Sequence, residues 1–353
     1  MRGRPVGSIW RNVISWFGAL LLVGLFFFLQ KGNLAEAFGH IRHSSLLFLF
    51  FAVLIEALFY PFQAVVCTAL LRPLGVRPPF VPFTLLLAIV ATSNRLLPSY
   101  GGSGLAAFIY WGRRLHLQPA LTVVMNSAYT LVAYLAESFL ILYATGAFVR
   151  LSLLPREPSA AVRSPESLLL GLWLLASVLT LALLFTVIFV THNQRRWLGL
   201  THRLSAGVGR LPWIGGRLLH LIRSGLGEVW PFVERYRRQS RILILACLCY
   251  FLLFAVRISL LLCLFAAVGH PLSAQLVLVG YGITQLITWI SLIPNGFGIV
   301  EISMSWVFAQ LGAPIEVALA VTLLYRLITL LFPLPFGLAA SARFRRHHLP
   351  AAE

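Results

Sequence analysis

The feature that most constrains this chain is a series of apolar runs longer than the helices of a typical soluble domain. About 20 residues of helix cross a bilayer core about 30 Å thick, so apolar runs of roughly 18 residues or more indicate membrane spans. Only 11% of the 353 residues are charged, whereas a soluble domain carries about 25%. The sequence therefore predicts an all-α polytopic membrane protein. Its expected full spans are 13–30, 44–71, 119–148, 168–191, 242–268 and 315–340.

Two further apolar regions, near 80–112 and 273–312, are interrupted by stretches rich in Pro and Gly. The first stretch reads NRLLPSYGGSG (94–104) and the second reads LIPNGFGIVE (292–301). The segments beside them are short for a full crossing, and irregular backbone is tolerated at membrane depth when protein or a wet cavity surrounds it. We therefore expect two re-entrant helical hairpins. Their turns would contain Pro98, Gly101, Gly102, Pro294, Gly296 and Gly298.

The order of these expected elements repeats in the two halves of the chain. Residues 1–150 hold three spans and the first hairpin. Residues 151–353 hold three spans, a basic loop at 192–241 and the second hairpin. Because each half has an odd number of crossings, the second half must run through the membrane in the opposite sense. Such inverted repeats occur in many transporters, whose sites lie near the midplane where interrupted helices meet.

The net charge of +18 comes almost entirely from arginine, and much of it flanks the apolar runs. Strong positive charge also suits nucleic-acid binding, but arginine beside spans is what the positive-inside rule predicts for cytoplasmic loops. The flanks of the first hairpin, the 192–241 loop and the tail at 343–348 all carry this charge. We therefore expect a multi-pass protein of the cytoplasmic (inner) membrane, with both termini in the cytoplasm and no nucleic-acid partner.

The basic loop has a pattern of its own. Apolar residues recur at three- or four-residue steps from Leu218 to Tyr236, and several Arg accompany them. This pattern is typical of a basic amphipathic helix that lies on an anionic leaflet. A solvated connector that obeys the same charge rule is the other interpretation.

Six ionisable side chains are expected at membrane depth, three acidic and three basic. Each costs roughly 2.5–3.5 kcal/mol near a helix centre, and pairing acids with bases offsets much of that cost. One interpretation is therefore structural ion pairing. The other is a polar path for a lipid headgroup or a coupling proton. The six residues are Glu56, Arg95, Glu137, Arg257, Glu301 and Arg326.

Two of the six lie within the interrupted stretches, where Pro and Gly leave backbone amides without helical partners. Arg95 beside such amides favours an anion site. Glu301 begins the return segment of its hairpin, where the positive end of a helix favours an acid, and Arg326 is its candidate partner. Asn94 and Asn295 add polar groups to the two stretches.

No metal site, cofactor or catalytic residue set is predicted. The four Cys lie inside apolar runs, and the nine His show no HxxxH or HxxE spacing. Cysteine in such runs is usually a small apolar residue of a helix, and these spacings form neither a zinc site nor a disulfide framework.

The second stretch and the residues after it resemble the C-terminal signature of the lysylphosphatidylglycerol synthase transmembrane family, also described as flippase-like membrane proteins. The matching residues are Pro294, Gly296, Gly298, Glu301, Gly312 and Arg326. The first stretch resembles the first-half hairpin of the family. Its matching residues are Asn94, Pro98, Gly101 and Gly102. In layout, the resemblance covers nearly the whole chain.

The resemblance implies a lipid flippase-like fold. In the multiple peptide resistance factor, this module moves aminoacylated phosphatidylglycerol across the bacterial membrane, and a separate soluble domain makes that lipid. The present sequence ends soon after its last expected span, so it resembles a stand-alone membrane module without the synthase domain. It also departs from the family's pattern. GGSG lacks the acidic residue that many relatives carry after the Gly, and Asn126 and Ser127 stand where relatives often have a Glu-Arg pair.

We therefore expect a transporter rather than an enzyme. It would move a polar or anionic lipid (a phospholipid, aminoacylated lipid, hopanoid or glycolipid) through a cavity between the hairpins, lined by Arg95, Glu301 and Arg326. Membrane lipids would be its partners, with a second copy or a lipid-synthesis enzyme as further ones. An integral-membrane lipid or glycosyl transferase, with Glu301 or Glu137 as base, is one alternative. A non-transporting partner of a lipid-synthesis enzyme is the other.

Overall fold

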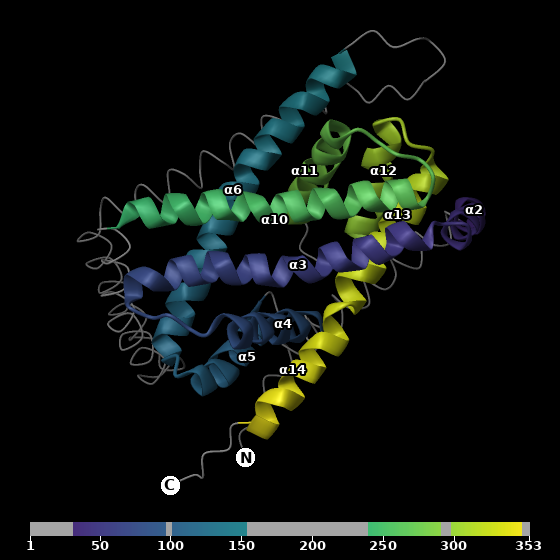
Figure 1. The fold of residues 1–353 in the computed structure, drawn as a ribbon. Coiled ribbons are helices and arrows are strands. Elements are labelled where there is room, and N and C mark those ends of the chain that lie inside the picture. Colours follow the sequence, from purple (N-terminus) through teal and green to yellow (C-terminus); the bar gives the residue numbers. More distant parts are fainter. Residues whose placement is uncertain (1–30, 97–100, 154–238, 291–297, 348–353) are drawn as a thin grey trace, which may run out of the picture.

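The computed structural model describes residues 31–96, 101–153, 239–290 and 298–347, and these residues are helical apart from short connections (Figure 1). The helices of the first half are α2 (Lys31–Arg42), α3 (Leu46–Leu71), η1 (Arg72–Leu74), α4 (Phe80–Leu96), α5 (Gly102–Gly112), η2 (Arg113–Leu115) and α6 (Pro119–Leu153). Those of the second half are α10 (Ser240–Ala267), α11 (Ala274–Ile290), α12 (Ile299–Gln310), α13 (Ile315–Leu331) and α14 (Pro333–His347).

Four helical stretches in the described residues are long and apolar enough to cross a membrane. They are Leu46–Leu74, Pro119–Arg150, Ile244–Ala267 and Ile315–Phe344. These stretches confirm four of the six expected spans. The expected spans 13–30 and 168–191 and the amphipathic segment of the basic loop lie outside the described residues.

The last expected span differs from the prediction because it is broken into two helices. Pro333 has no N–H to continue the α13 ladder, and a second Pro follows in the same turn, so α14 begins a new helix there. The break is held by α4, whose Thr92 hydroxyl donates a hydrogen bond to the Pro333 carbonyl at 2.7 Å. The residues between the first two expected spans form the helix α2.

The long helices α3 and α10 run side by side through the middle of the molecule in opposite directions (Figure 1). At one end, the backbone N–H of Ser45 donates to the Ala267 carbonyl at 2.8 Å. One face of α3 carries residues spaced four apart, Ala52, Glu56 and Tyr60, and these are buried. The opposite face exposes large apolar side chains such as Phe50 and Leu54. An exposed apolar face of that size suits contact with lipid.

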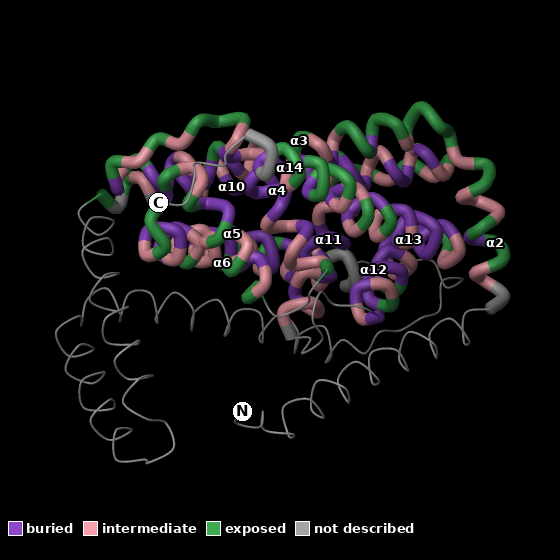
Figure 2. Tube along the Cα trace, turned by 90° about the horizontal axis from the view of Figure 1, so that it is seen from below, coloured by how far each residue is buried: buried purple, intermediate pink, exposed green. Residues whose placement is uncertain are grey.

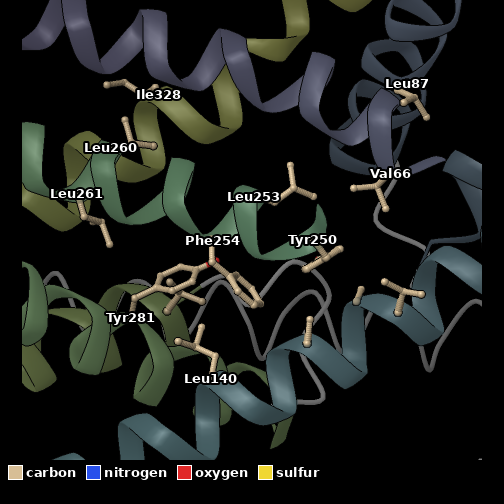
Figure 3. Packing of buried hydrophobic residues seen from close by; sticks show 14 of the residues in the cluster. Val66, Leu87, Leu140, Tyr250, Leu253, Phe254, Leu260, Leu261, Tyr281 and Ile328 are labelled. Atoms are coloured by element: carbon tan, nitrogen blue, oxygen red, sulfur yellow. The ribbon is translucent and has the colours of Figure 1, made fainter. Parts of the chain in front are cut away.

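Each half also contains a pair of short helices, which are α4–α5 in the first half and α11–α12 in the second. The short pairs cross between the halves: α4 packs against α14, and α11 packs against α6. The interior between these layers is buried and the outer turns of α3 are exposed (Figure 2). In that interior Leu253 lies on the side of α10 that faces α3, and Phe254 on the side that faces α6 (Figure 3).

Left-handed backbone positions recur in the same order in both halves. In the described residues, φ is positive at six positions, three in each half. Gly75 follows α3 as Gly269 follows α10, Gly101 precedes α5 as Gly298 precedes α12, and His116 precedes α6 as Gly312 precedes α13. Glycine fits such positions because it has no Cβ to clash. The chain thus makes the same sequence of turns twice. The re-entrant placement of the short pairs in a bilayer stays a prediction.

Candidate functional site

The central helix pair carries a buried ion pair. Glu56 of α3 is fully buried and Arg257 of α10 is 9% exposed. The Arg257 guanidinium donates to Glu56 Oε2, and its carbon lies 4.0 Å from the centroid of the Phe59 ring. A buried charge is tolerated only when it is paired. Glu56 and Arg257 are therefore paired, and the pair joins α3 of the first half to α10 of the second.

Arg95 belongs to the same cluster. It lies in the last turn of α4, and its Nη1 donates to the Tyr60 hydroxyl at 3.0 Å. Tyr60 is one helical turn beyond Glu56 and is 4% exposed. Arg95 also interacts electrostatically with Glu56. Two guanidinium groups therefore act on one carboxylate, and Tyr60 is hydrogen bonded to one of them. Arg95 is itself only half-buried.

The second ion pair lies in the second half. Arg326 Nε lies 2.8 Å from Glu301 Oε1, and Arg326 Nη2 donates to Oε2 at 3.5 Å. This two-point contact is the fork geometry that Arg forms with carboxylates. It confirms the predicted pairing. Glu301 is in the first turn of α12, also as predicted, and each of the two side chains is 13% exposed. The Glu301 carboxylate is thus more exposed than that of Glu56, whereas the two arginine side chains are almost equally exposed, at 13% and 11%.

Glu137 differs from both pairs. It lies near the middle of α6, and its carboxylate accepts hydrogen bonds from two neutral donors, both in the second half of the chain. Trp289 Nε1 of α11 donates to Oε2 at 2.8 Å, and the Tyr250 hydroxyl of α10 donates to Oε1 at 3.3 Å. Among the described residues, no Lys, Arg or His forms an ion pair with it.

Asn94 serves the fold of the first short-helix pair. Its Oδ1 accepts hydrogen bonds from the Gly104 backbone N–H at 2.7 Å and from the Ser103 hydroxyl at 3.3 Å. The Gly101 cap of α5 offers no side chain of its own. Asn94 of α4 therefore satisfies an amide at the start of α5 that would otherwise lack a helical partner.

The structure thus brings Glu56, Arg95 and Arg257 together, joins Glu301 to Arg326, and places Glu137 with aromatic donors. Gly101, Gly102 and Gly298 begin the second helix of each pair, as the predicted turns require. The remaining expected site residues lie outside the described residues; they are Pro98, Pro294, Asn295 and Gly296.

Sequence reasoning missed three residues that hold these charges: Tyr60, Tyr250 and Trp289. Helical spacing could have found two of them. Tyr60 stands four residues after Glu56, and Tyr250 stands seven before Arg257, so each shares a face with a charge. Trp289 has no such local signal, because its partner Glu137 comes from the other half of the chain.

A family comparison decides what kind of protein contains these pairs. The family model described as the lysylphosphatidylglycerol synthase TM region matches residues 14–337. The chain belongs to this family. A search of curated proteins finds no match to the chain. Membership and the apolar helices together make this a multi-pass membrane protein, and the family indicates a function related to membrane lipids.

The charged side chains of these pairs are suited to the recognition of charged groups. In the described part of the chain, no group of three or more His, Cys or Glu is placed to hold a metal ion. Its polar groups are guanidinium, carboxylate, phenol and indole. Arg suits phosphate and carboxylate groups, because its planar fork donates two parallel hydrogen bonds.

Proposed function

We propose that this protein is a flippase-like transporter that moves a polar or anionic lipid across the membrane. The lipid headgroup would pass through the polar interior between the two short-helix pairs while the acyl chains stay in the bilayer. Family membership supports a lipid as the transported molecule, because the family indicates a lipid-related function. The repeated order of helices and left-handed turns supports the transport, because inverted repeats allow a site to face either side.

The Glu301–Arg326 pair is the observation that carries this proposal. It stands at the start of a short helix, at the break in the second half, and it is partly exposed. An anionic headgroup could compete with Glu301 for the Arg326 fork, because phosphate and carboxylate oxygens accept the same hydrogen bonds. In the central pair the Glu56 carboxylate is fully buried, so an incoming headgroup has less room to displace it. We therefore assign the headgroup contact to Arg326 and the structural link between the halves to Glu56 and Arg257.

The topology that goes with this function is six full spans with α4–α5 and α11–α12 as oppositely oriented re-entrant hairpins. The arginine-rich segments would face the cytoplasm, so both termini would lie on that side of the cytoplasmic membrane. Accessibility of single cysteines introduced at Gly75 and Gly269 tests this arrangement. Labelling of the two positions from opposite sides supports the inversion, and labelling from the same side contradicts it.

Lipid movement in proteoliposomes tests the function itself. Purified protein is reconstituted with lipids whose fluorescent headgroups are quenched only from outside, and the rate of exchange is measured. We expect Arg326→Ala to slow exchange at least about tenfold, which corresponds to losing roughly 1.4 kcal/mol of interaction with the moving headgroup. Glu316→Gln, a carboxylate one helix away at the start of α13, is the matched control and keeps the native rate.

Unchanged exchange in folded Arg326→Ala protein would contradict the assignment of the site. No exchange by native protein with any anionic or zwitterionic lipid would contradict the function. The transferase alternative makes a different prediction, since purified protein with a lipid-linked donor would form a new covalent product. Co-purification with a lipid-synthesis enzyme without exchange would favour the non-transporting alternative.

A further inference from the structure

Glu137 is the intramembrane acid whose environment the proposed headgroup path does not explain. Glu56 and Glu301 each have an arginine partner, but among the described residues Glu137 accepts hydrogen bonds only from the Trp289 indole and the Tyr250 hydroxyl. Desolvation penalises an ionised carboxylate, and neutral donors offset only part of that penalty. A carboxyl in this setting avoids the rest of the cost by binding a positive charge from outside the protein.

The groups around Glu137 supply no such charge. The ionisable residues that interact with it, in the described part of the chain, are Tyr129 of its own helix, Tyr250 of α10 and Tyr281 of α11. All three are neutral phenols under ordinary conditions. Trp289 adds a donor without charge, and its indole is held by an edge-to-face contact with Tyr134, at a centroid distance of 5.2 Å.

The geometry favours a proton over an organic cation. An indole N–H and a phenol O–H point outward in the plane of their rings, so both rings present edges to the carboxylate. An ammonium group binds over a ring face, and neither bonded ring offers its face there. A metal ion would need several oxygen ligands, whereas the described residues hold no group of three or more His, Cys or Glu that could bind one.

Tyr250 can serve both states of the carboxyl. Its hydroxyl donates to Glu137 Oε1 when the carboxylate is ionised. When Oε1 carries the proton, the new O–H can donate to the Tyr250 oxygen, because a phenol both donates and accepts. The Tyr129 ring packs against the Tyr250 ring, at a centroid distance of 5.7 Å.

We propose that Glu137 is a proton-binding site whose Oε1 keeps the Tyr250 hydroxyl as its hydrogen-bond partner in both protonation states. Uptake converts the carboxylate to the neutral acid by forming an O–H bond at Oε1, with water on one side of the membrane as the proton donor. Release breaks that bond and returns the proton to water on the other side. As a link between proton and lipid movement this inference rests on the proposed function, but the binding site itself does not.

Infrared difference spectroscopy tests the binding site without reference to transport. Spectra of the purified native protein at acidic and at alkaline pH are subtracted, and the C=O band of a protonated carboxyl is followed. We expect a band that is lost in Glu137→Gln and retained in Glu316→Gln. Tyr250→Phe keeps the carboxyl and removes its hydroxyl partner, so the band should shift to higher frequency. A difference spectrum that Glu137→Gln leaves unchanged would overturn the proposal.

Transport under a pH gradient tests the coupling separately. A gradient across the proteoliposome membrane should change the initial rate of lipid exchange in native protein, and Glu137→Gln should lose this response while still exchanging lipid. A gradient response that survives in Glu137→Gln would overturn the coupling. If the carboxyl band behaves as expected but native protein exchanges no lipid, the proton site stands and the proposed function fails.

Discussion

The α4–α5 pair and the α11–α12 pair follow the same helical plan but differ in what holds the start of the second helix. Both second helices begin directly after a glycine with positive φ, Gly101 or Gly298. Three residues later, the first pair has Gly104 and the second has Glu301. Gly104 is covered by the neutral amide of Asn94, whereas Glu301 reaches out to Arg326.

This difference teaches that the fold and the chemistry are separable in the two halves. In the first pair, the stabilising contact joins its own two helices, α4 and α5. The second is held by an ion pair to another helix, from α12 to α13. A repeated backbone can therefore be stabilised by a neutral contact on one side and leave a charged pair, partly exposed, on the other.

The largest loss of stability is expected when only one partner of the Glu301–Arg326 pair is removed. Arg326→Gln leaves Glu301 without its partner, and losing one member of a buried pair costs roughly 3–5 kcal/mol. Because both side chains are 13% exposed, we expect the lower end, about 3 kcal/mol. The free energy of unfolding in mixed detergent micelles measures it.

The double variant Glu301→Gln/Arg326→Gln is the control for that experiment. It removes both charges at once, so it should recover most of the lost stability. A double variant as unstable as Arg326→Gln alone would show that the pair is not the interaction that holds α12 to α13.

An intermediate loss of stability is expected when the neutral contact between Asn94 and Gly104 is disturbed. A Cβ at Gly104 would overlap the Asn94 side-chain amide, so Gly104→Ala should displace that amide and cost about 1–3 kcal/mol, as overpacking does. Gly39→Ala on α2 is the matched control, because a Cβ there meets nothing within 4 Å. Equal stability of Gly104→Ala and native protein in the same unfolding assay would rule out the close contact between α4 and α5.

The smallest loss of stability is expected at the glycines that precede α5 and α12, where the two short-helix pairs are alike. Gly101→Ala and Gly298→Ala each force a Cβ into left-handed backbone, at a cost of roughly 1–2 kcal/mol. Because φ is +89° at Gly101 and +81° at Gly298, the two losses should agree within the error of the unfolding measurement. A loss confined to one variant would mean that the two breaks are not equivalent.

Local sequence determined the helices and their interruptions. The apolar runs gave α3, α6 and α10 close to their expected bounds, because membrane helices must be long and apolar. The Pro and Gly of the interrupted stretches predicted the starts of α5 and α12, because left-handed backbone requires glycine or a similar residue. The sequence offered Arg326 as a candidate partner of Glu301, and the structure joins the two.

Only the tertiary structure decided which distant charges meet. Glu56 and Arg257 are paired because α3 packs against α10, and Glu137 meets Trp289 because α6 packs against α11 of the other half. Residue spacing carries no information about such contacts, since each joins segments far apart in the sequence. The sequence by itself therefore determined which charged residues lie within the apolar segments. The packing of one half on the other decided that Glu56 and Glu301 are paired with arginine, while in the described part of the chain Glu137 has only neutral donors.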